Sequence, residues 1–172
     1  MQIPVSYSKG MSRKYPEHVV IAIVPERSGK YNPITLEWTM TTSHDPPMMA
    51  ISVGLPRYSL GLIREARQFV IAFPSAEMAS DALFYGTHSG RDMDKIDYFG
   101  TETQPALKID GVLFCGAVAN FECSLESELE TGDHVIFVGR VLASHINQNS
   151  EMRRLYTLDK NLTLGPVQSL FP

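Results

Sequence analysis

Short apolar segments separated by turn residues constrain the fold of this chain most strongly. The segment from His18 to Val24 is continuously apolar and ends at Pro25. Residues 33–42 alternate apolar and polar side chains, which is the pattern of a strand with one buried face. The segments that read as strands are 18–24, 33–42, 48–53, 69–73, 112–125 and 134–145. The sequence therefore predicts about six strands.

Helical spacing occurs only in the connections between these segments. We expect helices over 58–68, 76–85 and 92–99, begun by Ser59, Ser75 and Asp92 as N-caps. Strands and helices do not alternate regularly, so a doubly wound parallel sheet is not expected. The pattern favours a mainly β fold with helical insertions, either a barrel or a sandwich.

We expect one domain over residues 1–172, with a core of about 18–148. The first 16 residues are predicted to form an arm, and residues 149–172 to pack at an edge or on a dimer partner. The start has no apolar signal segment and no run is long enough to span a membrane, which predicts a cytoplasmic protein without a membrane partner.

Charge and motifs exclude several function classes. The formal net charge of −4 argues against nucleic acid as a partner. Cys115 and Cys123 lie too far apart in one predicted strand to form a disulfide, and neither they nor the histidines have metal-ligand spacing. The nucleotide-binding, metalloprotease and nucleophile-elbow motifs are also missing from the sequence.

Two segments combine cations, hydroxyls and helix starts, a composition that suits a phosphate group. The first is Arg57-Tyr58-Ser59, and the second is Ser89-Gly90-Arg91 followed by Lys95 one turn later. In isolation, the simpler interpretation of each is a capped surface helix with solvated charges. Neither segment alone therefore identifies a ligand.

Two further segments are candidates for contact with a flat ring. The polar face and backbone of residues 32–41 could border a heteroaromatic ligand, although the segment is also typical of an amphipathic strand with Trp38 in the core. His134, after Gly132-Asp133, could donate to such a ligand or simply end a hairpin turn.

Taken in order, the segments resemble the flavin reductase-like family, and within it the flavoredoxin-type members. The resemblance covers about residues 18–148. The segments that carry it are Asn32-Pro-Ile-Thr-Leu-Glu-Trp38, Asp45-Pro46-Pro47, Arg57-Tyr58-Ser59, Ser89-Gly90-Arg91-Asp92-x-Asp94-Lys95, Asn120-Phe121-Glu122-Cys123 and Gly132-Asp133-His134. Such a family member would be an FMN-binding split β-barrel that forms a homodimer.

The resemblance also implies roles for individual residues. The side chains of Asn32 and Trp38 would lie beside the ring or ribityl chain, and the backbone of residues 39–41 would meet the polar edge of the ring. Cations and hydroxyls of the two phosphate-suited segments would hold the phosphate. His134 is the best candidate for a catalytic group, and Phe171 for an aromatic that closes the site. The expected cofactor-binding residues are Asn32, Thr35, Trp38, Thr39, Met40, Thr41, Arg57, Tyr58, Ser59, Ser89, Gly90, Arg91, Lys95 and His134.

The implied activity is hydride transfer from NADH or NADPH to flavin. The alternatives are a flavoredoxin-type FMN carrier that serves redox protein partners, and a barrel that has lost flavin. Two residues depart from the family pattern, because Glu37 stands where a Ser is common and Ile96 where a Phe is common. The carboxylate of Glu37 would affect the redox potential more than flavin binding.

Overall fold

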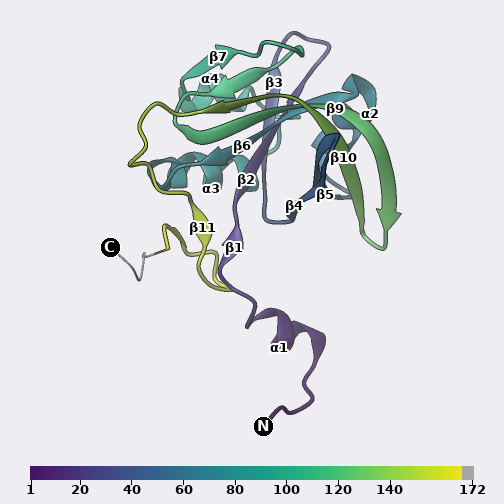
Figure 1. Cartoon of the computed structure of the whole chain (residues 1–172), viewed down its shortest axis with the longest axis vertical. Helices are drawn as coiled ribbons and strands as arrows, with labels where there is room; N and C mark the ends of the chain where they lie inside the picture. Colours follow the sequence, from purple (N-terminus) through teal and green to yellow (C-terminus); the bar gives the residue numbers. More distant parts are fainter. Residues whose placement is uncertain (168–172) are drawn as a thin grey trace.

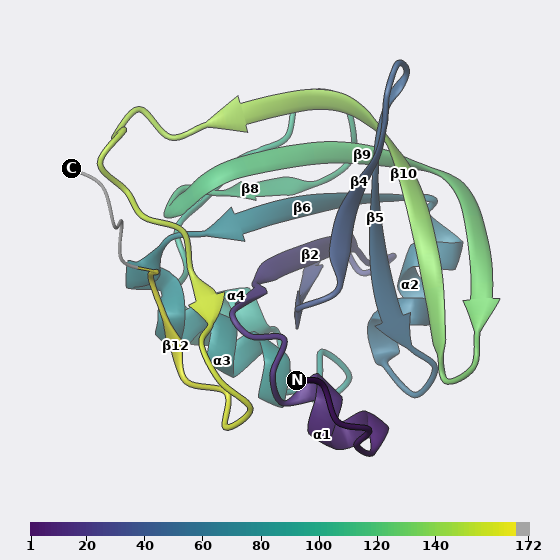
Figure 2. The same cartoon turned by 60° about the horizontal axis from the view of Figure 1, so that its bottom comes forward.

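The computed structural model describes residues 1–167 and is built around one antiparallel sheet of seven strands. The order across the sheet is β3-β2-β6-β9-β10-β5-β4. Figure 2 shows that the sheet is strongly curved. Its two end strands, β3 and β4, do not pair with each other. The strands are β2 (Val20–Pro25), β3 (Tyr31–Leu36), β4 (Thr39–His44), β5 (Pro47–Gly54), β6 (Gln68–Pro74), β9 (Ala117–Thr131) and β10 (His134–Ile146). This arrangement confirms the predicted mainly β fold, a barrel that is open on one side.

The helices and remaining strands lie around this sheet (Figure 1). They are α1 (Tyr7–Met11), α2 (Tyr58–Ala66), the 3₁₀ helix η1 (Ala76–Met78), α3 (Ala79–Thr87), α4 (Lys95–Phe99), β1 (Glu17–His18), β7 (Thr103–Pro105), β8 (Val112–Phe114), β11 (Tyr156–Thr157) and β12 (Leu164–Gly165). None of the described helices is long and apolar enough to cross a membrane.

Two apolar cores explain why some strands are apolar throughout. Along β2, Val20, Ala22 and Val24 face the core inside the curved sheet. Ile21 and Ile23 face a second core with α3 and β8. Strand β6 divides its side chains between the two cores in the same way. Because both faces of these strands are buried, their sequences show continuous apolar runs. The prediction for 69–73 is confirmed by β6, whereas the predicted strand over 18–24 corresponds to β2 from Val20 onward, with His18 in the separate strand β1.

The prediction of one strand over 33–42 is wrong. The chain leaves β3 after Leu36 and enters β4 at Thr39, so Glu37 and Trp38 form the crossing between the two edges of the sheet. Trp38 is 41% exposed and therefore does not belong to the core. The alternation continued across the break although only β3 has buried side chains and β4 has none, so the pattern did not correspond to one buried face.

Several predicted boundaries also differ. The strand predicted over 112–125 is β8 followed by a turn and the longer β9, and Cys115 lies in that turn; both cysteines are free. Asp94, and not Asp92, is the N-cap of α4, and its side chain accepts from the Asp97 amide. The N-cap residue of α2 is Arg57, whose side chain makes no capping hydrogen bond. Ser59 therefore lies inside the helix and is not its N-cap. Ser75 precedes η1 without a side-chain hydrogen bond.

The two terminal segments pack together. β11 pairs with β1 on one side and with β12 on the other, forming a small separate sheet. Residues 156–165 therefore pack beside the N-terminal segment. The predicted N-terminal arm contains the short helix α1, which Figure 1 shows projecting away from the barrel. Phe171 lies outside the described residues.

Candidate functional site

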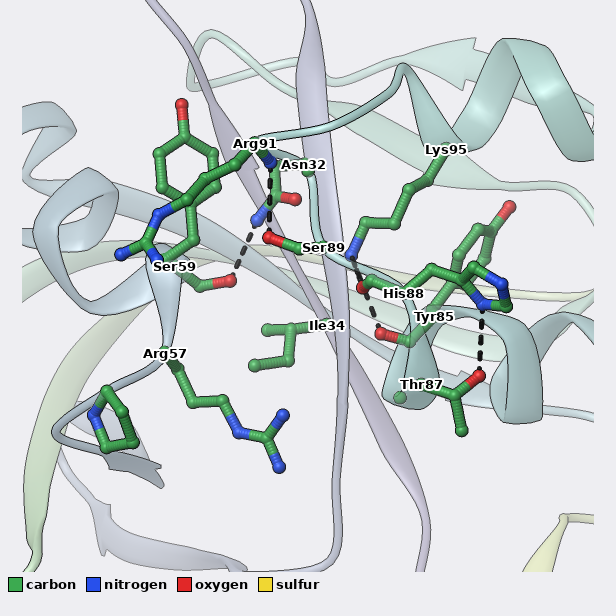
Figure 3. Close-up of a pocket in the computed structure, with 14 residues that line it drawn as sticks. Asn32, Ile34, Arg57, Ser59, Tyr85, Thr87, His88, Ser89, Arg91 and Lys95 are labelled. Atoms are coloured by element: carbon green, nitrogen blue, oxygen red, sulfur yellow. Dashed lines mark hydrogen bonds between the residues drawn. The ribbon is translucent and has the colours of Figure 1, made fainter.

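A cavity of about 220 Å³ brings together the two segments that suit a phosphate. The start of α2 forms one wall, the loop after α3 forms another, and β3 lies between them (Figure 3). The lining residues are Asn32, Ile34, Pro56, Arg57, Tyr58, Ser59, Tyr85, Gly86, Thr87, His88, Ser89, Gly90, Arg91 and Lys95. We call this space the phosphate-suited cavity.

The phosphate-suited cavity carries positive charge without an acidic neighbour in its lining. Arg57, Arg91 and Lys95 line it, and within residues 1–167 no Asp or Glu does. Neither arginine forms an ion pair within residues 1–167. The Arg91 guanidinium lies 5.4 Å from the centre of the Tyr58 ring, which supports it without neutralising it. This arrangement leaves the cations available to a dianion.

A buried amide connects the two walls of the cavity. The Asn32 side chain donates from Nδ2 to Ser59 Oγ at 2.8 Å, while its Oδ1 is buried without a partner. A Cβ on Gly90 would lie 2.1 Å from that Oδ1, so only glycine allows the loop to approach so closely. The cavity therefore holds one unused buried acceptor, and Ser59 keeps its own hydroxyl proton for another partner.

Lys95 lies at the base of the cavity and is only 3% exposed. Its ammonium group donates to the Pro33 carbonyl and to the His88 carbonyl at 3.3 Å. Burial lowers the pKa of Lys95 to about 8, while the nearby Glu26 carboxylate acts to raise this pKa and Arg57 to lower it. Lys95 thus connects β3 to the loop that carries Ser89 and Arg91, besides contributing charge.

Two more cavities lie near the first. Arg57, Gly86 and Thr87 line both the phosphate-suited cavity and a second space of about 240 Å³ beside β12. That second space contains Thr35 and shares Glu37 with a third, larger cavity of about 400 Å³. The third cavity is lined by Trp38, Thr39 and Met40, and we call it the Trp38 cavity.

His134 lies close to this series of cavities at the start of β10. Its ring centre is 4.6 Å from that of Trp38, and its Nδ1 contacts Asp133 Oδ1 at 2.7 Å. The remaining ring nitrogen faces Gly54, where an added Cβ would lie 3.5 Å away. The pairing with His134 lowers the pKa of the Asp133 carboxyl, which favours its ionised form.

The structure therefore groups the predicted site residues into neighbouring sets. The phosphate-suited cavity gathers Asn32, Arg57, Tyr58, Ser59, Ser89, Gly90, Arg91 and Lys95. Thr35 lines the second cavity, and its hydroxyl donates to the Ala82 carbonyl. Thr41 lines none of the three. Sequence reasoning missed Tyr85 and His88, since helical spacing in α3 gave no sign that its end borders a cavity.

Comparison with known sequences identifies the family. A model of the flavin reductase like domain matches residues 11–163. A protein of Archaeoglobus fulgidus, described as uncharacterized, is 34% identical over 113 residues, 66% of this chain and 64% of that protein. An NADH-dependent FAD reductase of Streptomyces globisporus is 30% identical over 108 residues, 60% of this chain and 57% of that protein. The chain thus aligns with less than two thirds of each of these relatives.

Solved structures agree with this assignment. The FMN-binding protein of Thermus thermophilus with bound p-hydroxybenzaldehyde superposes with a TM-score of 0.85 at 26% identity, covering 100% of this chain and 99% of that one. The flavoredoxin of Methanosarcina acetivorans gives 0.87 at 21% identity, covering 100% and 94%, which shows the shared fold. This chain belongs to the flavin reductase-like domain family.

Proposed function

We propose that this protein binds FMN and is an oxidoreductase that accepts hydride from NADH or NADPH. The observation that carries the proposal is the phosphate-suited cavity, whose lining among the described residues has three cations and no carboxylate. The FMN-binding protein of Thermus thermophilus and the NADH-dependent FAD reductase of Streptomyces globisporus support the proposal by similarity.

The residues present fit the FMN side chain at more than one point. Arg57, Arg91 and the Ser59 hydroxyl would hold the terminal phosphate by charge-assisted hydrogen bonds. The unused Asn32 Oδ1 can accept a hydrogen bond from a ribityl hydroxyl, whereas a phosphate dianion could not donate one. The ring would then lie toward Glu37, Trp38 and His134. FMN supplies the electron-transfer chemistry when bound, and the chain positions it.

His134 is the residue that we propose to orient the nicotinamide or to hold a proton near the ring. Asp133 accepts from its Nδ1, which leaves Nε2 near Gly54. A His with one nitrogen fixed by a carboxylate presents the other in a defined orientation.

A carrier of the flavoredoxin type remains the second candidate function. The fold likeness to the Methanosarcina acetivorans flavoredoxin favours it. The two candidates differ in whether a nicotinamide reduces the bound flavin. We also propose a homodimer, supported by the exposed apolar side chains of Met40, Leu129 and Leu142. Sedimentation should give a mass near twice 19.2 kDa.

Titration with FMN tests the binding proposal. Arg91→Ala and Arg57→Ala should each weaken FMN binding by about tenfold, as expected for loss of a charge-assisted phosphate contact. Arg13→Ala removes an exposed cation of the N-terminal segment and serves as the matched control. Equal affinity in all four proteins would remove both arginines from the phosphate site.

Anaerobic mixing separates the two functions. If the protein is a reductase, adding NADH or NADPH should bleach the flavin absorption within seconds. Bleaching by dithionite alone would favour the carrier. If the protein neither contains flavin nor takes up added FMN, the flavin proposal is wrong and the barrel serves another function.

A further inference from the structure

The N-terminal arm, residues 1–16, exposes apolar side chains that no other part of the described chain covers. Residues 1–10 are all exposed, and Figure 1 shows the arm projecting away from the barrel. Its helix α1 has only five residues and buries none of them. A helix this short is not stable through its own hydrogen bonds, so the arm needs a surface to pack on.

The first seven residues of the arm have the pattern of a strand with one apolar side. Apolar residues alternate strictly with other residues, and each apolar one is at least half exposed. The apolar positions are Met1, Ile3, Val5 and Tyr7. In an extended chain these side chains all point to one side. Pro4 lacks an amide proton, which restricts such a strand to the edge of a sheet.

The large sheet has a free edge at the end of β9. Strand β6 pairs with β9 only as far as Ser124, whereas β10 continues the pairing to Thr131. Within residues 1–167, no strand other than β10 pairs with residues 126–131, and all six side chains are exposed. We call these residues the β9 edge. Such an edge presents unpaired backbone groups that an extended segment can bind by strand addition.

The β9 edge also offers apolar surface to an added strand. Leu129 is 61% exposed, and Ile136 of β10 lies directly opposite it in the pairing. Side chains directly opposite each other on neighbouring strands lie on the same face of a sheet. The apolar side of residues 1–7 can therefore extend this pair by one more strand.

Charge favours the arm as the occupant of the β9 edge. The edge contains three glutamates and no cation. Two of them pair with Arg64, and Glu126 forms no ion pair within residues 1–167. Like charges disfavour pairing of this edge with the same edge of another copy. The arm has no carboxylate, and its cations Lys9 and Arg13 form no ion pair within the same residues.

The position of the arm points to a second copy as its partner. Residues 1–7 pair with no strand of their own chain within the described residues 1–167. The base of the arm nevertheless starts close to the edge, because Lys14 and Thr131 both line the Trp38 cavity. In a two-fold arrangement, each arm can then reach the edge of the other copy, and the two contacts are equivalent.

We propose that residues 1–7 of one copy add a strand to the β9 edge of a second copy, and that this exchange of arms holds the homodimer together. The inference rests on the homodimer proposed above and requires no bound flavin. It assigns a function to an arm that the proposed flavin site does not use.

Sedimentation of the full chain and of a variant lacking residues 2–8 tests the exchange. The deletion should raise the dimer dissociation constant at least about tenfold, because the added strand and its apolar side are lost. Val5→Ser should raise it about threefold or more, whereas Gln2→Ser, on the other side of the same segment, is the matched control. Circular dichroism verifies that all four proteins fold.

A variant of the edge tests the other half of the contact. Glu126→Lys places a cation where the cationic arm docks and should raise the dissociation constant about three- to tenfold. Glu151→Lys makes the same charge change at an exposed glutamate outside the edge and is the control. Hydrogen exchange of residues 126–131 should be slower in the full-chain dimer than in the variant lacking residues 2–8.

Three outcomes would overturn the inference. Equal dissociation constants for the full chain and the deletion variant would place the dimer contact elsewhere, while the homodimer itself would stand. A full chain that is monomeric at every concentration would refute the homodimer and the exchange together. Exchange of residues 126–131 that is the same with and without the arm would show that the arm docks on another surface.

Discussion

At the scale of single residues, the close approach of Gly90 to Asn32 shapes the phosphate-suited cavity. Neither residue is unusual in the sequence, and only the structure shows that a Cβ would lie 2.1 Å from Asn32 Oδ1. The resemblance did predict that the cations and hydroxyls of the two phosphate-suited segments lie together. It could not predict the distance between strand β3 and the loop that contains Gly90.

Gly90→Ala should displace Asn32 from Ser59 and weaken FMN binding by about tenfold, since a buried hydrogen bond is lost. Gly61→Ala is the matched control, because a Cβ at this position of α2 meets nothing within 4 Å. FMN titration measures the effect, and urea unfolding verifies that both variants fold. An affinity equal to that of the Gly61 variant would contradict the proposed role of the approach.

Burial of Lys95 makes stability depend on pH in a defined window. Its folded pKa of about 8 lies below the ordinary value of 10.5, so between these values the unfolded chain holds a proton that the folded chain does not. The free energy of unfolding should therefore gain up to roughly 3 kcal/mol from this group as pH rises from about 8 to 10.5. Urea unfolding across this window measures it.

Lys95→Met should remove this rise, because the variant has no ammonium group to deprotonate. Lys160→Met, at an exposed turn, is the control for loss of one lysine charge. If the Lys95 variant keeps the full pH dependence of the parent, the ammonium group is better solvated than its contacts indicate.

At the scale of elements, strands with both faces buried were predictable and the crossing between β3 and β4 was not. Continuous apolar runs located β2 and β6 because each contributes to two cores. The crossing at Glu37 and Trp38 depends on strand order, since β3 and β4 are the two ends of the sheet. The alternation of apolar and polar residues along one segment carries no information about the order of strands in the sheet. The sequence therefore predicted neither the break between β3 and β4 nor the exposure of Trp38.

The register between β9 and β10 depends on Gly139. The pairing shifts between Val138 and Gly139, and a Cβ on Gly139 would lie 2.7 Å from the Phe69 ring and 2.8 Å from Cys123 Cβ. Gly139→Ala should therefore destabilise the fold by about 1–3 kcal/mol through overpacking. Urea unfolding measures this loss, with Gly10→Ala in the exposed helix α1 as control. A loss no larger than that of the control would show that β10 can shift to make room.

At the scale of the whole molecule, the C-terminal segment decides whether the chain unfolds as one unit. Leu155 is fully buried in the core shared with α3, and its amide donates to the Pro74 carbonyl at 3.0 Å. Residues beyond it pair with β1 and line the cavity next to the phosphate-suited one. The segment therefore joins the second core to the cavity wall. The single domain expected from the sequence stays a prediction, which cooperative unfolding can test.

Leu155→Ala should lower the free energy of unfolding by about 2–5 kcal/mol, because it leaves a cavity in the second core. If the chain is one cooperative unit, Trp38 fluorescence and circular dichroism should report one transition, and the substitution should shift both signals equally. Leu158→Ala, at a partly exposed leucine of the same segment, should have a much smaller effect. A variant in which only the circular dichroism transition shifts would show that the C-terminal segment unfolds separately from the region around Trp38, and that the wall it adds to the cavities opens before the barrel does.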